Sequence, residues 1–206
     1  MASSERVAGV ILAGGLARRM GGHDKGLMTL GGTPLLDRVI ARLASQVDTL
    51  VINANGDPSR FAMHRLPVVA DGIPGAAGPL AGVLSGMDWA AEQGCRWIAT
   101  AATDTPFFPA DLVRRLRAAV AQNKGSLGCA SSGGRLHPLF GLWAVELRDD
   151  LRNALTGEGV RKVDAWTGRH RVAVVDFPTA PYDPFFNANR PEDLAAAEHM
   201  LQEHRL

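Results

Sequence analysis

The sequence predicts an α/β fold, a three-layer α/β/α sandwich around a mostly parallel sheet with some antiparallel strands. Through much of the chain, short apolar runs alternate with segments whose apolar residues recur at helical spacing. This alternation favours right-handed strand–helix–strand units, and therefore a Rossmann-like parallel sheet. The pattern is more mixed after the third helical segment, where two strand-like runs, 126–132 and 137–145, follow each other directly. We therefore expect the antiparallel strands there.

The expected elements follow in order along the chain. Strands are expected at 7–12, 48–55, 66–71, 96–104, 126–132, 137–145 and 172–178, and helices at 33–46, 78–93, 109–123 and 190–204. For the first helix, Thr33 is the expected N-cap and Pro34 the expected first helical residue. Leu35, Val39 and Leu43 then recur on one face of that helix. Since ligands in open sheets of this kind bind beyond the carboxyl ends of the strands, the sequence places a site there.

Length and composition narrow the class of protein. A chain of 206 residues suits one α/β domain, which we expect to span residues 1–206. A net charge of +1 gives no basic surplus, so we expect no nucleic-acid partner. No apolar run reaches membrane-spanning length and the N-terminus lacks a signal peptide's basic region, so we expect a cytoplasmic protein without membrane contact. Cys95 and Cys129 are expected to be two buried thiols, although a disulfide between them stays an alternative.

A glycine-rich, basic segment follows the first expected strand. Residues 11–26 read ILAGGLARRMGGHDKG and hold five glycines and three basic side chains. Backbone N–H groups in such a loop can cradle phosphate oxygens, while a surface turn is the structural alternative. The loop is not a Walker A motif, because Lys25 is followed by Gly26, and no GxGxxG dinucleotide fingerprint follows the strand.

The pattern Leu-Ala-Gly-Gly, then Arg-Met-Gly, then Asp-Lys resembles a known phosphate loop. It is similar to that of nucleotidyltransferases with a sugar-nucleotide-pyrophosphorylase-like fold, and most similar to the molybdenum cofactor guanylyltransferases. The segments GPLAG (78–82), TDTPFF (103–108), HPLFGLW (137–143) and NANRPEDL (187–194) resemble further parts of that family in the same order. Many relatives that use other nucleotides carry Pro-Lys in place of the Asp-Lys pair.

This resemblance implies a reaction and its participants. The expected activity is transfer of GMP from GTP to the terminal phosphate of molybdenum-molybdopterin, with Mg²⁺ as cofactor and pyrophosphate as leaving group. Molybdenum insertion proteins and molybdoenzyme chaperones are the implied protein partners. Two alternatives stay open. One is a sibling that uses CTP, or another nucleotidyltransferase; the other is a non-catalytic cofactor-binding chaperone of the same fold.

Site residues are carried over by position. The nucleotide-binding set is Leu12, Ala13, Gly14, Gly15, Lys25, Asn53, Asp71 and Asp104; the catalytic set is Arg19, Lys25 and Asp104; the acceptor-binding set is Asn187 and Asn189. The resemblance also implies that Asp104, which ends an apolar strand before Thr105 and Pro106, is the Mg²⁺ ligand; by position alone, a turn or cap residue is the structural alternative. Arg18 is adjacent to Arg19 and could take the same role. We choose Arg19 as the catalytic residue because it is the arginine of the Arg-Met-Gly pattern.

Several of these residues have structural alternatives. Asn53 and Asp71 are common residues at strand ends, and Asn189 with Pro191 and Glu192 has the pattern of a helix capping box. His137 precedes a proline in an expected strand, which favours a packed or hydrogen-bonded side chain over an acid–base role. Four aromatic residues are expected to be core residues: Phe107, Phe108, Trp143 and Phe185.

Overall fold

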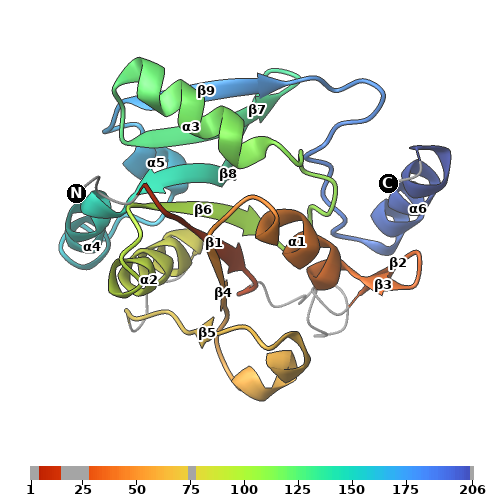
Figure 1. The fold of residues 1–206 in the computed structure, drawn as a ribbon, viewed down its shortest axis with the longest axis horizontal. Coiled ribbons are helices and arrows are strands. Elements are labelled where there is room, and N and C mark those ends of the chain that lie inside the picture. The colour runs from red at the N-terminus through yellow and green to blue at the C-terminus, as the bar shows by residue number, and fades with distance from the viewer. Residues whose placement is uncertain (1–4, 15–27, 74–77, 205–206) are drawn as a thin grey trace.

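A computed structural model describes residues 5–14, 28–73 and 78–204. It contains one seven-stranded sheet (Figure 1). In sheet order the strands are β5 (Val68–Val69), β4 (Thr49–Asn53), β1 (Val7–Leu12), β6 (Trp97–Ala102), β8 (Arg135–Ala144), β7 (Leu127–Ser132) and β9 (Val172–Phe177). Only β8 runs antiparallel to its neighbours, β6 and β7. The expected mostly parallel sheet with antiparallel additions is confirmed.

Helices cover both faces of this sheet and make the three layers (Figure 1). The helices are α1 (Leu35–Ala44), α2 (Pro79–Glu92), α3 (Leu112–Asn123), α4 (Arg148–Thr156), α5 (Val163–Thr167) and α6 (Pro191–His204). Buried side chains of α1 and α3 share one core cluster with one face of the sheet, and those of α2, α4 and α5 share another. Successive side chains of β1 point to opposite faces of the sheet, and this separates the two clusters. Val7 and Ile11 belong to the first cluster, and Ala8 and Val10 belong to the second.

A short hairpin precedes the first helix, and it corrects the expected helix start. Strands β2 (Thr29–Leu30) and β3 (Thr33–Pro34) pair antiparallel across Gly31 and Gly32, which have φ angles of 56° and 77°. Thr33 is thus a strand residue, Pro34 is the N-cap and the helix begins at Leu35. Glycine accepts the left-handed backbone that this two-residue turn requires. The hairpin lies beside α6 in Figure 1, and the two share a third core cluster.

Other elements were not expected from the pattern. These are α4, α5 and the 3₁₀ helices η3 (Pro58–His64) and η4 (Val145–Leu147). The strand expected at 66–71 is reduced to the two residues of β5, so Asp71 lies just beyond its end. Cys95 and Cys129 are free and buried, which confirms the expectation of two thiols. Within the described ranges, no helix has the length and apolar character needed to cross a membrane.

The direction of chain progression reverses between β1 and β6. From β1 the chain continues to β4 and β5 on one side, whereas β6 pairs with the other side of β1. The loops that leave such neighbouring parallel strands diverge, and a crevice opens between them at the carboxyl edge. The antiparallel β8 brings its amino-terminal half to the same edge, because its pairing with β6 begins only at Leu142.

Candidate active site

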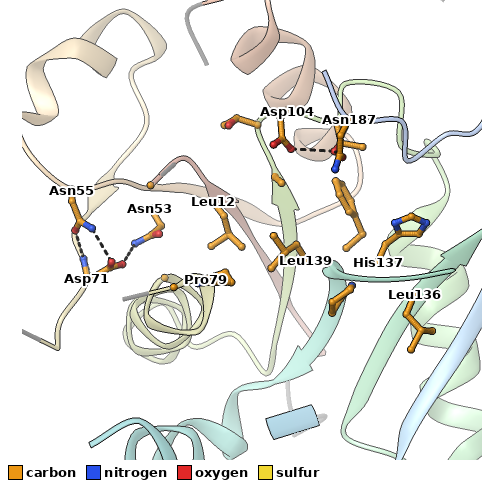
Figure 2. Close-up of a pocket in the computed structure, with 18 of the residues that line it drawn as sticks. Leu12, Asn53, Asn55, Asp71, Pro79, Asp104, Leu136, His137, Leu139 and Asn187 are labelled. Carbon is orange, nitrogen blue, oxygen red and sulfur yellow. Dashed lines mark hydrogen bonds between the residues drawn. The ribbon is translucent and has the colours of Figure 1, made fainter. Parts of the chain in front are cut away.

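A cavity of about 720 Å³ opens at this carboxyl edge of the sheet. It extends over the ends of β4, β1 and β6 and along the first half of β8 (Figure 2). Its lining residues are Leu12, Gly14, Asn53, Asn55, Asp71, Gly78, Pro79, Gly82, Ala102, Thr103, Asp104, Thr105, Arg135, Leu136, His137, Pro138, Leu139, Phe140 and Asn187. The sequence placed the site at this edge, and the cavity lies there.

One side of the cavity is built from Asn53, Asn55 and Asp71 (Figure 2). Asn53 Nδ2 donates to Asp71 Oδ1 at 3.0 Å, and Asn55 Nδ2 donates to Asp71 Oδ2 at 2.7 Å. The backbone N–H of Asp71 donates to Asn55 Oδ1 at 2.9 Å, which closes the network. A carboxylate has about four acceptor positions, so Asp71 keeps acceptor capacity for a ligand in a fixed orientation.

Helix α2 reaches this network through a glycine. A Cβ on Gly82 would overlap Asn53 Oδ1 and lie 3.0 Å from Leu12 Cδ2, so only glycine fits at this position. The close approach brings Gly78 and Pro79, at the amino end of α2, to the cavity wall. The unpaired N–H groups and the dipole of a helix favour negative charge at that end.

The middle of the cavity holds Asp104 and Asn187, which are 83 positions apart in sequence. Two contacts join their segments. Ala188 N–H donates to the Asp104 carbonyl oxygen at 2.7 Å, and the Thr105 hydroxyl donates to Asn187 Oδ1. Asp104 lies two residues after the end of β6, and its Oδ1 is 3.3 Å from the Thr105 hydroxyl oxygen. The strand end and the segment before α6 therefore present a carboxylate and an amide side by side (Figure 2).

The far side of the cavity is the amino-terminal half of β8. Its lining is mainly apolar, with Arg135 and His137 as the polar members. His137 stacks on Phe185 with ring centroids 4.5 Å apart and bonds to the Ser132 hydroxyl at 2.8 Å. The expectation of a packed, hydrogen-bonded histidine is confirmed, and Phe107, Phe108, Trp143 and Phe185 are buried core residues as expected.

The structure brings most expected site residues together. Leu12, Gly14, Asn53, Asp71, Asp104 and Asn187 line one cavity. Ala13 is buried beside it and donates its N–H to the Asn53 carbonyl oxygen at 2.8 Å. Gly15, Arg19 and Lys25 lie outside the described residues.

Asn189 lies two residues after Asn187, and the capping box expected around it is different in detail. Asp193 Oδ2 accepts the backbone N–H groups of Asn189 and Arg190, at 3.0 and 2.9 Å. Because α6 begins at Pro191, Asp193 is its third residue and performs the reciprocal capping that Glu192 was expected to perform.

Sequence reasoning missed Asn55, Gly82 and Thr105. Asn55 lies two positions after Asn53, beyond the end of β4, and this spacing was a usable signal. Gly82 reads as an ordinary helical glycine until the helix is placed against Asn53. Thr105 became significant only through its contact with Asn187.

No group of three or more His, Cys, Asp or Glu side chains suited to a metal occurs among the described residues. This donor set does not exclude Mg²⁺ in a nucleotide site, because Mg²⁺ is held there by one or two carboxylates together with phosphates and water. Asp104 supplies one carboxylate and Asn187 a neighbouring amide oxygen, and both are hard oxygen donors. The chemistry of these donors therefore fits a magnesium ion that arrives with a triphosphate.

The fold is a doubly wound α/β sheet with a cavity where the strand order reverses, and it occurs in other solved proteins. Two solved structures share the fold. Molybdopterin-guanine dinucleotide biosynthesis protein A from Archaeoglobus fulgidus is 23% identical, with a TM-score of 0.73 and coverage of 95% of this chain and 99% of that one. The 4-diphosphocytidyl-2C-methyl-D-erythritolsynthase from Anaerococcus prevotii is 13% identical, with a TM-score of 0.76 and coverage of 96% of both chains.

Among proteins of this fold, the chain belongs to the MobA-like NTP transferase family, whose domain model matches residues 9–173. It is 55% identical over 194 residues to the molybdenum cofactor guanylyltransferase of Nitrobacter hamburgensis, covering 93% of both chains. It is 54% identical over 196 residues to that of a Bradyrhizobium species, covering 94% of this chain and 92% of the relative. A nucleotidyltransferase of this family usually uses a divalent metal ion.

Proposed function

We propose that this protein transfers GMP from GTP to the terminal phosphate of molybdenum-molybdopterin, releasing pyrophosphate and forming the guanine dinucleotide form of the cofactor. The observation that carries the proposal is the 55% identity to a molybdenum cofactor guanylyltransferase over nearly the whole chain. The cavity supports it, because it extends from the polar Asn53–Asp71 side to the apolar β8 side and so has room for two substrates.

The nucleotide occupies the side of the cavity near β4 and β1. Backbone groups of residues 12–14 contact the base, and Asn53 or Asp71 completes the set or holds the ribose. Guanine carries an N1–H and an exocyclic amine, and the carboxylate of Asp71 is an acceptor fixed by two amides. Gly15 contributes its backbone N–H to the phosphate-binding loop.

Asp104 would hold Mg²⁺, and Asn187 and Asn189 contact the acceptor. The ion, when bound, offsets negative charge on the phosphates during transfer. Lys25 and Arg19 act as cations on the triphosphate and on the leaving pyrophosphate. The acceptor phosphate is already ionised at neutral pH, so the in-line attack needs no general base.

We propose that the reaction takes place in the cytoplasm and that the chain forms a single domain. Two free, buried thiols fit a reducing compartment. One sheet that takes strands from residue 7 to residue 177 supports a single domain across the chain. Molybdenum insertion proteins are the proposed suppliers of the acceptor, and molybdoenzyme chaperones are the proposed receivers of the product.

Pyrophosphate release with Mg²⁺ and molybdenum-molybdopterin tests the proposal, with GTP, ATP and CTP titrated side by side. We expect kcat/KM for GTP to exceed that for ATP and CTP by roughly a hundredfold, because unmatched polar groups in the site reject the other bases. A preference for CTP would identify the cytidylyl-transferring sibling. Tight pterin binding without pyrophosphate release would identify a chaperone.

Lys25→Ala is expected to lower kcat about tenfold and to change KM for GTP much less. Charge on the leaving pyrophosphate grows during transfer, so a cation there stabilises the transition state more than the bound substrate. Steady-state kinetics at saturating acceptor separates the two parameters. A rise in KM at constant kcat would make Lys25 a binding residue only.

A further inference from the structure

Three side chains next to the cavity form a chain of hydrogen bonds. Ser132, the last residue of β7, is 2% exposed. Its Oγ donates to Asp183 Oδ1 at 2.8 Å and is 2.8 Å from His137 Nε2. Asp183 Oδ1 also accepts the backbone N–H of Phe185 at 3.0 Å, which holds the carboxylate in place.

The number of protons available to these three hydrogen-bonded side chains determines the tautomer of His137. An ionised carboxylate has no proton to donate, so the single hydroxyl proton of Ser132 points to Asp183. Ser132 Oγ must then accept from His137, and we assign the ring proton to Nε2. In the neutral ring this leaves Nδ1 with a free lone pair, a hydrogen-bond acceptor.

The surroundings keep the His137 ring neutral and fixed. Burial lowers the pKa of the His137 imidazole below its usual value; the Asp183 carboxylate opposes this shift, and Arg135 adds to it. Stacking on Phe185 at an interplanar angle of 19° fixes the plane of the ring. None of the hydrogen bonds among the described residues uses Nδ1.

His137 lies on the side of the cavity opposite the Asn53–Asp71 network (Figure 2). Its neighbours in the lining are Leu136, Pro138 and Leu139, and Leu136 is 54% exposed. Apart from Arg135, this wall is apolar, and it offers one fixed acceptor, which suits a flat heterocycle that carries an N–H group. Nδ1 does not suit a phosphate, because a phosphate offers acceptors and a neutral Nδ1 cannot donate to it; Arg135 is the group in this wall that can bind a phosphate.

We propose that His137 selects the acceptor substrate by accepting a hydrogen bond at Nδ1 from an N–H of its pterin ring, with Ser132 and Asp183 as the positioning residues that fix the ring. This inference rests on the proposed function, since the pterin is the acceptor that function requires. It assigns His137 a role in acceptor binding and none in proton transfer.

Two isosteric variants separate the two ring nitrogens. His137→Gln places an amide nitrogen near the position of Nε2 and keeps the bond to Ser132, but it removes the acceptor at Nδ1. His137→Asn places an amide oxygen near the position of Nδ1 and gives up the bond to Ser132. Both variants lose the stacking on Phe185, so each controls for packing in the other, and melting temperatures check the fold of both.

We expect His137→Gln to raise the KM for molybdenum-molybdopterin about tenfold, with kcat and the KM for GTP within twofold of the parent. His137→Asn keeps an acceptor but loses the bond to Ser132 and the stacking on Phe185, so it should raise the KM for molybdenum-molybdopterin less, by about threefold. Direct titration of molybdenum-molybdopterin without nucleotide should show the same order of dissociation constants. Equal loss in both variants, or loss in neither, would overturn the inference.

Nitrogen NMR of the histidine rings gives a readout that does not depend on turnover. We expect the parent to show His137 protonated at Nε2, the Nδ1 resonance to move when molybdenum-molybdopterin binds, and Ser132→Ala to give a mixture of tautomers. A proton on Nδ1 in the free parent would contradict the assignment. If the enzyme uses CTP instead of GTP but the His137 variants still change the KM for molybdenum-molybdopterin as expected, the proposed function fails and this inference stands. If the parent protein does not bind molybdenum-molybdopterin, both are overturned.

Discussion

Asp104→Asn is expected to lower kcat by about a hundredfold or more and to leave the protein folded. The amide keeps the shape of the carboxylate and an acceptor for the Thr105 hydroxyl, and the carbonyl oxygen that accepts the Ala188 N–H is unchanged. Only the negative charge that the proposed Mg²⁺ site requires is lost. Removing one electrostatic group of this kind costs roughly 3 kcal/mol of transition-state stabilisation.

The measurement is pyrophosphate release at increasing Mg²⁺, with the melting temperature as a check on folding. The concentration of Mg²⁺ for half-maximal rate should rise as well. Asp111→Asn is the matched control, because it removes a carboxylate in an exposed pair with Arg114 and should leave turnover within twofold. Turnover of Asp104→Asn within threefold of the parent would remove Asp104 from the mechanism.

Gly82→Ala is expected to lower kcat/KM for GTP by about a hundredfold. The added methyl group would occupy the position of Asn53 Oδ1, and Asn53 cannot move aside without losing its bonds to Asp71 and the Val69 carbonyl oxygen. The shift of Asn53 would in turn move Asp71 and the first turn of α2. A misplacement of about 1 Å in a substrate site can cost roughly a hundredfold.

Gly86→Ala is the matched control for this variant. Its Cβ would lie 2.7 Å from Val10 Cγ2 on the same face of α2, so it also crowds the helix against the sheet. Crowding of this kind costs roughly 1–3 kcal/mol of stability, partly offset by the better helix propensity of alanine. We expect similar falls in melting temperature for both variants, but a loss of GTP use only for Gly82→Ala. Equal kinetic losses would show that helix position alone, and not Asn53, is responsible.

Patterns within a few residues determined much of the fold. Apolar runs bounded by glycine or polar residues gave β1, β6 and β7 nearly to the residue, because strands buried on both faces need continuous apolar sequence. The start of α1 was predicted wrongly for a physical reason. Thr33 and Pro34 satisfy the preferences of a helix start, but the two glycines before them form a hairpin that takes both residues into β3.

By itself, the sequence determined the fold class, the edge of the sheet where the cavity opens and the position of Asp104 just after β6. Each follows from local order along the chain, since the end of a strand is also the end of its apolar run. Only the tertiary structure decided which distant groups meet: Asn55 with Asp71, Gly82 with Asn53, Asn187 with Thr105, and Ser132 with Asp183 and His137. No local pattern encodes these contacts, because they depend on how helices and loops pack onto the finished sheet and on which polar atoms that packing leaves to be paired.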